Sequence, residues 1–309
     1  MSAPLERLAA GALGWLGANV DHFDPFSASA PPTALAKAKA ALELALLCHC
    51  ASRLPEPTQA LDGARALVRG LWQDPGLPRL LAEVPAYAST YALIYGALAP
   101  DAIDGTQVRA TLAALHPGFL SPQGKSAYQR VEIRHYADKA GVRHTVEPYA
   151  ELLPLSPLVA YRAAEPADTA AQDGAPLTEP QAYALTHTAF YLGDFGRTAP
   201  GLAGQDLEHA RDLVDRMLRH CVAHHRWDLA AELVLTQYIL GSEPLETSSG
   251  AAAVECLVRA QRPGGAIPGR SAALAAHPSA PAGESFAKAY HTTLVTALMA
   301  LVVSSPRPS

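Results

Sequence analysis

Residues 256–269 read CLVRAQRPGGAIPG, and residues 290–301 further along the chain read YHTTLVTALMAL. The first stretch ends an amphipathic helical pattern over residues 251–261, and the second opens a strongly apolar helical pattern over residues 290–303. A Pro-Gly-Gly triplet and several later prolines separate the two patterns. Together they predict a helical hairpin in which one helix is amphipathic and the other is strongly apolar.

Similar pairs of helical patterns recur along the chain. Because one pair cannot bury its own apolar face, neighbouring pairs must stack, and a spacing of roughly 40 to 60 residues between centres is typical of helical repeats. The strongly apolar patterns cover residues 35–50, 87–98, 128–141, 183–195, 228–240 and 290–303. The amphipathic patterns between them cover residues 63–71, 204–220 and 251–261.

We expect an all-α fold, because the chain is rich in alanine and leucine and lacks alternating runs of Val, Ile and Thr. The repeated pairs predict a single domain over residues 1–309, an α/α toroid of about six helical hairpins with the apolar helices inside. An open α-solenoid built from the same pairs is the alternative. The polar residues 165–180 are expected to form a flexible loop between two helices.

The composition limits the classes of partner. With 49% hydrophobic residues, 17% charged residues and a net charge of −5, the 309-residue chain has the composition of a globular protein with a large core. It has no run of Lys and Arg, so we expect no nucleic-acid partner. Without a signal peptide or a long uninterrupted apolar run, we expect a cytoplasmic protein with no membrane partner. The four cysteines form no C-x-x-C pair and are expected to be reduced core thiols.

The hairpin quoted above resembles the last hairpin of the α/α toroids of terpenoid cyclases and protein prenyltransferase β-subunits. Those repeats have an outer helix that ends in Leu-x-x-x-Gln, a Gly-Gly turn and an inner helix that opens with Tyr-His-Thr. The resemblance implies a toroid, and it maps the zinc-binding histidine of the prenyltransferases onto His291. The companion Asp-x-Cys ligands would fall at residues 228–230, where alanine replaces the cysteine. The acidic motifs of the cyclases are missing, so neither named chemistry is supported.

One apolar pattern contains a regular stripe of polar residues. Residues 186–196 read THTAFYLGDFG, which places His187, Tyr191 and Asp194 at i, i+4 and i+7. On an inner helix these side chains would face a central cavity that holds water or ligand. We therefore expect His187 and Asp194 to act as acid/base groups and Tyr191 to bind substrate. The alternative is a buried histidine with an aspartate at the end of the helix, which the neighbouring glycines favour.

A second candidate site lies in the pattern over residues 228–240. Asp228 and Glu232 stand at i and i+4, so their carboxylates repel each other unless they share a proton, a cation or an arginine. Such a pair suits general acid/base catalysis. With His291 it would form a two-carboxylate, one-histidine set for a divalent metal such as zinc, which is our candidate cofactor. The alternative for Asp228 is a helix N-cap.

A third candidate group lies on the unusually polar pattern YQRVEIRHY at residues 128–136. Glu132, His135 and Tyr136 share one face, and we expect Glu132 to be catalytic and the other two to bind substrate. Tyr91 belongs to a run of tyrosines at helical spacing and is a further candidate for substrate binding. The alternatives are an exposed helix with salt bridges for the first group and core packing for Tyr91.

Two functions agree with this pattern. The first is an enzyme that binds a small molecule or a peptide in the cavity and uses acid/base or metal-assisted chemistry. The second is a non-catalytic ligand-binding or scaffold protein with the same ring. The many titratable residues on apolar helices favour the enzyme, because a scaffold does not need them. The alanine-rich composition is typical of proteins of bacterial specialised metabolism, so we expect a role in biosynthesis. The oligomeric state is left open.

Overall fold

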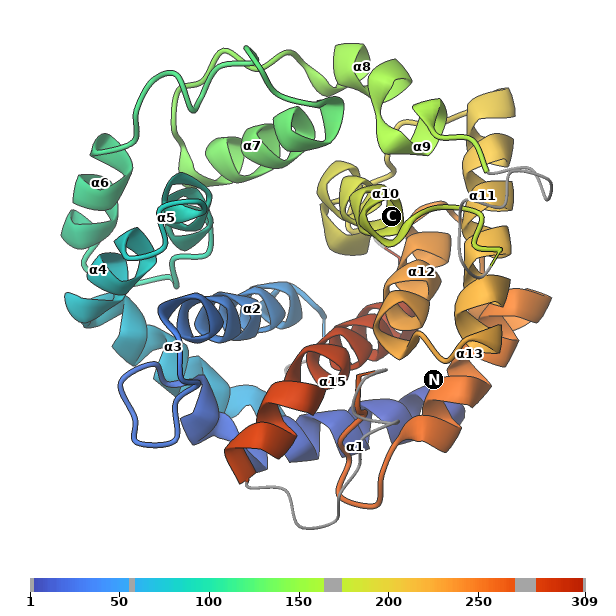
Figure 1. The fold of residues 1–309 in the computed structure, drawn as a ribbon, viewed down its shortest axis with the longest axis horizontal. Helices are drawn as coiled ribbons and strands as arrows, with labels where there is room; N and C mark the ends of the chain where they lie inside the picture. The colour runs from blue at the N-terminus through green and yellow to red at the C-terminus, as the bar shows by residue number, and fades with distance from the viewer. Residues whose placement is uncertain (1–2, 56–58, 164–173, 270–281, 308–309) are drawn as a thin grey trace.

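The computed structural model describes residues 3–55, 59–163, 174–269 and 282–307. All regular secondary structure within these ranges is helical, which confirms the prediction of an all-α fold. Seen down its shortest axis, the molecule is a ring of helices in two layers (Figure 1). The layers follow the division between apolar and amphipathic patterns in the sequence, because the helices that are apolar all round must be covered on their outer side.

The inner layer contains the strongly apolar patterns. Each predicted pattern corresponds to one helix that lies nearest the centre of the ring in Figure 1. The boundaries differ from the predicted ones by a few residues at most ends. The inner helices are α2 (Ala34–Ser52), α5 (Ala88–Ala97), α7 (Ala127–Ala140), α10 (Glu179–Leu192), α12 (Trp227–Ile239) and α15 (Ala282–Ser304).

The outer layer contains the three predicted amphipathic helices and several elements that no pattern indicated. The short helices were not predicted, because their apolar positions are too few to give a clear period. The N-terminal helix was also missed, although its buried residues Leu5, Leu8, Ala12, Leu13 and Leu16 follow a helical period. The outer helices are α1 (Ala3–Ala18), α3 (Asp62–Gln73), α4 (Gly76–Ala82), α6 (Thr106–Ala113), α8 (Tyr149–Leu152), α9 (Pro157–Ala160), α11 (Gly204–Ala223) and α13 (Ser248–Ala260).

Local capping residues set the ends of the helices that carry the site. At the start of α7, Ser126 Oγ accepts a hydrogen bond from the backbone N–H of Gln129 at 3.2 Å, and the Gln129 side chain accepts one from the backbone N–H of Ser126 at 2.9 Å. Thr178 and Gln181 form the same capping box before α10. The predicted loop at residues 165–180 therefore ends two residues early, and residues 164–173 lie outside the described part of the chain.

The two ends of the helical array meet. Helix α1 packs against both α15 and α13, so the first helix lies on the last hairpin, as it would not in an open solenoid. Gln261 Nε2 donates hydrogen bonds to the carbonyl of Leu8 at 3.1 Å and to that of Gly265 at 3.2 Å. Gly265 has a φ of +89°, and a Cβ atom there would lie 2.0 Å from the carbonyl oxygen of Gly11. The Gly-Gly turn is thus the point at which the last hairpin contacts α1.

Helix α15 also has the length and composition of a membrane-spanning helix between Gly283 and Ser304. Its most apolar window is 72% buried inside the fold, where it packs against α1, α12 and α2. A core helix of a globular protein meets the same criteria of length and composition, so this helix is weak evidence for a membrane. The expected absence of a membrane partner stays a prediction.

We predict that Gly265→Ala lowers the free energy of unfolding by at least about 2 kcal/mol, because the new methyl group meets the backbone of α1 and the positive φ disfavours alanine. Gly264→Ala is the matched control, since a Cβ there meets nothing within 4 Å. Urea unfolding of both variants measures the difference. Equal stability of the two would contradict the proposed contact between the turn and α1.

Candidate functional site

A chain of polar side chains crosses the inner layer from helix to helix. Its members come from α2, α15, α12, α10 and α7, and each lies within hydrogen-bond or ion-pair reach of the next. We call this chain the polar belt. It consists of Glu43, His291, Glu232, His187, Tyr128, Glu132 and Tyr191.

Glu232 is the most buried charged group of the belt. Every residue of α12 from Leu229 to Ile239 is buried, and Glu232 is 1% exposed. Its Oε1 atom lies 3.6 Å from His187 Nε2 and 4.0 Å from His291 Nε2. Its Oε2 atom accepts a hydrogen bond from the hydroxyl of Thr186 at 2.5 Å. Two imidazoles and a hydroxyl thus provide the compensation that a carboxylate needs in an apolar helix.

His187 faces the interior of the ring. It lies on α10, which packs against α7 and α12, and its side chain is nevertheless 33% exposed. Its Nδ1 atom lies 3.3 Å from the hydroxyl of Tyr128. The protein around His187 disfavours its charged form, but the Glu232 carboxylate more than offsets this, so the pKa of His187 is raised. His187 therefore holds a proton more readily than a free histidine does.

Glu132 is a half-buried carboxyl group near the far end of the belt. The hydroxyl of Tyr191 donates a hydrogen bond to Glu132 Oε1 at 2.9 Å, and Tyr128 donates a second one. Burial raises the pKa of Glu132 in spite of these bonds and the nearby His187. The belt therefore connects two different acidic groups through His187 and Tyr128. One is the Glu132 carboxyl, whose raised pKa favours its protonated form, and the other is the Glu232 carboxylate, which pairs with imidazole. Groups whose pKa values are shifted in this way are typical of acid/base sites.

The other end of the belt is an ion pair between α2 and α15. His291 Nδ1 lies 3.1 Å from Glu43 Oε2, and Lys39 Nζ lies 3.6 Å from Glu43 Oε1. Burial alone would raise the pKa of Glu43, but His291 and Lys39 lower it overall, and Glu43 raises the pKa of His291 against the effect of burial. Sequence reasoning missed Glu43. The signal was present, because Glu43 is an isolated carboxylate in an apolar helix, as Glu232 is.

The prediction for Asp194 is wrong in its geometry. Helix α10 ends at Leu192, and Asp194 follows it with a φ of 43°, so it does not continue the helical stripe. Its carboxylate pairs with Lys139 Nζ at 2.7 Å and with Arg53, whose Nη1 lies at 3.0 Å. These two cations lower the pKa of Asp194 although burial acts against them. Asp194 therefore joins the ends of α2 and α7 through ion pairs, and its expected role as an acid/base group stays a prediction.

His135 and Tyr136 lie inside the wall of the ring, and not on its inner surface. They are 4% and 3% exposed. His135 Nδ1 lies 3.0 Å from the carbonyl of Tyr191, and its Nε2 atom has no hydrogen-bond partner among the described residues. Burial in this wall lowers the pKa of His135 to about 4. Such burial leaves both side chains little surface for a substrate, and their expected role in substrate binding stays a prediction.

Tyr91 lies on α5 next to the belt. Its ring stacks on that of Tyr87 with the centroids 5.5 Å apart, and it is only partly buried. Burial raises the pKa of Tyr91 to about 12, and the nearby charge of Glu43 adds to this shift. Tyr91 is therefore placed beside the belt, which agrees with the expected role in substrate binding and does not test it.

The predicted metal ligands do not form a three-ligand site. In the described ranges, no group of three or more His, Cys, Asp and Glu side chains is arranged to hold a metal ion. Asp228 instead accepts a hydrogen bond from the hydroxyl of Tyr183, and His291 Nδ1 is paired with Glu43. The N-cap alternative for Asp228 is also wrong, because Arg226 occupies that position.

A family model described as a domain of unknown function (DUF6895) matches residues 9–301 of the chain. The matched span includes every residue of the polar belt and runs from α1 into α15. No curated protein matches the chain.

We predict that Glu232→Gln lowers the pKa of His187, because the amide removes the negative charge that offsets the effect of burial. The matched control is Glu208→Gln, which changes an exposed glutamate of the outer helix α11. Titration of the histidine ring signals by NMR measures the pKa of His187 in each protein. An unchanged value in Glu232→Gln would show that the two side chains do not interact as described.

We predict that His135 makes the fold sensitive to acid. Its pKa is about 4 in the fold against an ordinary value of 6.5 for histidine, so stability is fully present above 6.5 and is lost as the pH falls toward 4. Between pH 7 and pH 4.5 the loss is roughly 2 kcal/mol for a shift of this size. The difference in unfolding free energy between wild type and His135→Phe should change by that amount over this range. A constant difference would contradict the neutral buried state.

Proposed function

The chain belongs to the family described as a domain of unknown function (DUF6895), and because that description assigns no activity, we propose a function from the polar belt. The protein is an enzyme that binds a small molecule or a peptide inside the ring and transfers protons by acid/base catalysis. The observation that carries this proposal is the burial of Glu232 between the imidazoles of His187 and His291.

The arrangement is costly for a protein that only folds or binds. Burying a carboxylate costs several kcal/mol of desolvation even when it is paired, and an apolar residue of similar size often gives equal or greater stability. Residues on either side of Glu232 in α12 are apolar and buried, so an apolar side chain would suit position 232. Retention of a charge at such a position is typical of sites where the charge acts in a reaction.

The belt supplies a path for protons. His187 carries a proton at neutral pH more readily than a free histidine, and part of its side chain is open to the interior. A substrate in the ring takes this proton in one half of the reaction. This transfer leaves the imidazole neutral, with its Nδ1 atom 3.3 Å from the hydroxyl of Tyr128. In the other half, the neutral imidazole accepts a proton from the substrate.

His291 lies on the opposite side of Glu232 and has a different task in this proposal. Its Nδ1 atom is paired with Glu43, which fixes the orientation of the ring and directs Nε2 toward Glu232. His291 is 27% exposed at its side chain and holds positive charge next to the reacting group. We assign it the role of orienting Glu232 and attracting anionic substrate groups.

We predict that purified wild-type protein and Glu208→Gln convert at least one member of a mixture of small polar metabolites and short peptides. His187→Gln and Glu232→Gln should each slow that conversion by about 10²- to 10⁴-fold, as expected for loss of a general acid/base group. Mass spectrometry of the mixture over time measures conversion, and thermal unfolding checks that the variants fold.

Two results would contradict this proposal. Undiminished conversion by both variants would remove His187 and Glu232 from the reaction. A compound that co-purifies with the protein in native mass spectrometry and is never converted would support the ligand-binding alternative instead.

A further inference from the structure

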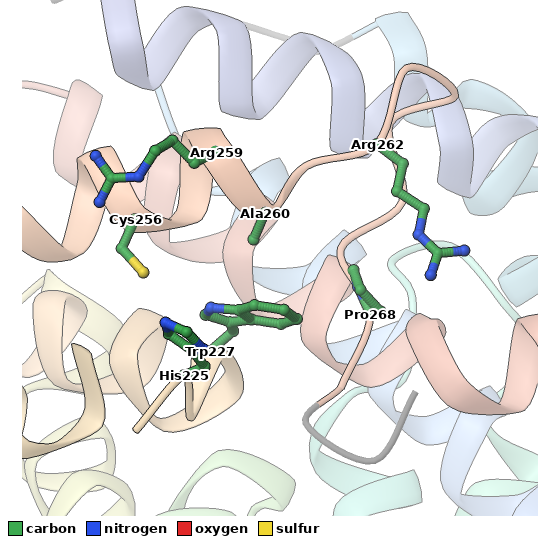
Figure 2. Close-up of a pocket in the computed structure, with 7 residues that line it drawn as sticks. All are labelled: His225, Trp227, Cys256, Arg259, Ala260, Arg262 and Pro268. Atoms are coloured by element: carbon green, nitrogen blue, oxygen red, sulfur yellow. The ribbon is translucent and has the colours of Figure 1, made fainter. Parts of the chain in front are cut away.

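A second hollow lies on the outside of the ring, between the start of α12 and the end of α13. Its volume is about 330 Å³, within the range of small-molecule sites. Trp227, the first residue of α12, lies in it with its indole between Cys256 on one side and Pro268 on the other (Figure 2). This outer cleft shares no residue with the polar belt and does not depend on the function proposed for the belt.

An aromatic platform forms one wall of the outer cleft. The rings of His225 and Trp227 stack with centroids 5.9 Å apart and an interplanar angle of 25°. The side chain opposite the indole is that of Ala260, which is too small to cover it (Figure 2). His225 has a φ of 54°, a conformation that costs a residue other than glycine about 1 to 3 kcal/mol and clusters at ligand sites. The platform therefore suits a flat ring.

The indole N–H of Trp227 has no acceptor among the described residues. Its Nε1 atom is buried and makes no hydrogen bond within the described part of the chain. A buried donor without a partner costs about 1–3 kcal/mol, so native structures nearly always pair it. Because this atom has almost no accessible surface, a ligand in the outer cleft meets the face of the indole and not its N–H.

The charge of the outer cleft is positive. Its lining includes Arg259 and Arg262 and no Asp or Glu side chain. Arg259 pairs with Glu255 at 2.6 Å, but both side chains are exposed, so this pair is weak. Arg262 is exposed and makes no ion pair or side-chain hydrogen bond within the described ranges, which leaves its guanidinium free for an anion.

From these three features we infer that the outer cleft binds a small planar anion, an aromatic or heteroaromatic ring that carries a carboxylate or a phosphate. The ring stacks on Trp227, and the acidic group pairs with Arg262. Arginine suits this role because its planar guanidinium can bind a carboxylate or a phosphate through two hydrogen bonds.

Isothermal titration calorimetry with two probes tests this inference on the full-length protein. Adenosine 5′-monophosphate represents a ring with a phosphate, and benzoate represents a ring with a carboxylate. We expect at least one of them to bind saturably, and the probe that binds tells which acidic group is preferred. Adenosine and inorganic phosphate should bind more weakly, because each provides only one of the two features.

Three variants separate the outer cleft from other sites. Arg262→Gln should weaken binding about tenfold or more, the effect of losing a charge-assisted hydrogen bond. Trp227→Phe keeps a ring but gives a smaller stacking face, and should weaken binding several-fold. Arg69→Gln is the matched control, since Arg69 is an exposed arginine of α3. No saturable binding of either probe, or equal binding by Arg262→Gln and Arg69→Gln, would overturn the inference.

Discussion

No methyl group fits between Gly265 and the backbone of Gly11, and this close approach holds the last hairpin against the first helix. The constraint matters because several inner helices, α12 above all, are apolar on nearly all sides. Helix α12 is buried along its whole length from Leu229 onward, which is possible only when neighbours lie on every side of it. In an open row of hairpins, the first and last pairs would each expose an apolar face to water. Here α1 packs against α13 and α15, so the apolar face of the last pair is covered.

The polar belt depends on the same contact. Its groups come from helices that are far apart in sequence, and Glu43 and His291 meet only because α2 and α15 pack side by side. Once these helices are in place, Glu232 cannot be hydrated from outside, so its charge must be compensated by its neighbours. The interior therefore combines a low-dielectric wall with a few strong interactions. That combination shifts the pKa values of Glu132 and His187 upward for different reasons, burial in the first case and a carboxylate in the second.

The histidines illustrate how position decides protonation. His135 lies in the wall with one nitrogen bonded to a carbonyl and the other without a partner among the described residues, and its neutral form is favoured. His187 and His291 face carboxylates, and their charged forms are favoured. The stability that these two ion pairs contribute is present below the ordinary pKa of histidine and is lost as the pH rises through the raised values. Protonation of His135 therefore lowers the stability of the fold, whereas protonation of His187 and His291 raises it.

The sequence by itself determined the helical class, the division into apolar and amphipathic helices and the places of all six inner helices, because these follow from local periodicity. It also indicated Glu232, His187, Glu132 and His291 as unusual polar residues on apolar helices. Only the tertiary structure decided which of them meet. In the folded chain Asp194 forms ion pairs with Arg53 and Lys139. The carboxylate of Asp228 accepts a hydrogen bond from Tyr183, and Glu43 pairs with His291. The reason is physical: periodicity states which face of a helix a residue occupies, whereas a contact depends on which distant helix packs against that face.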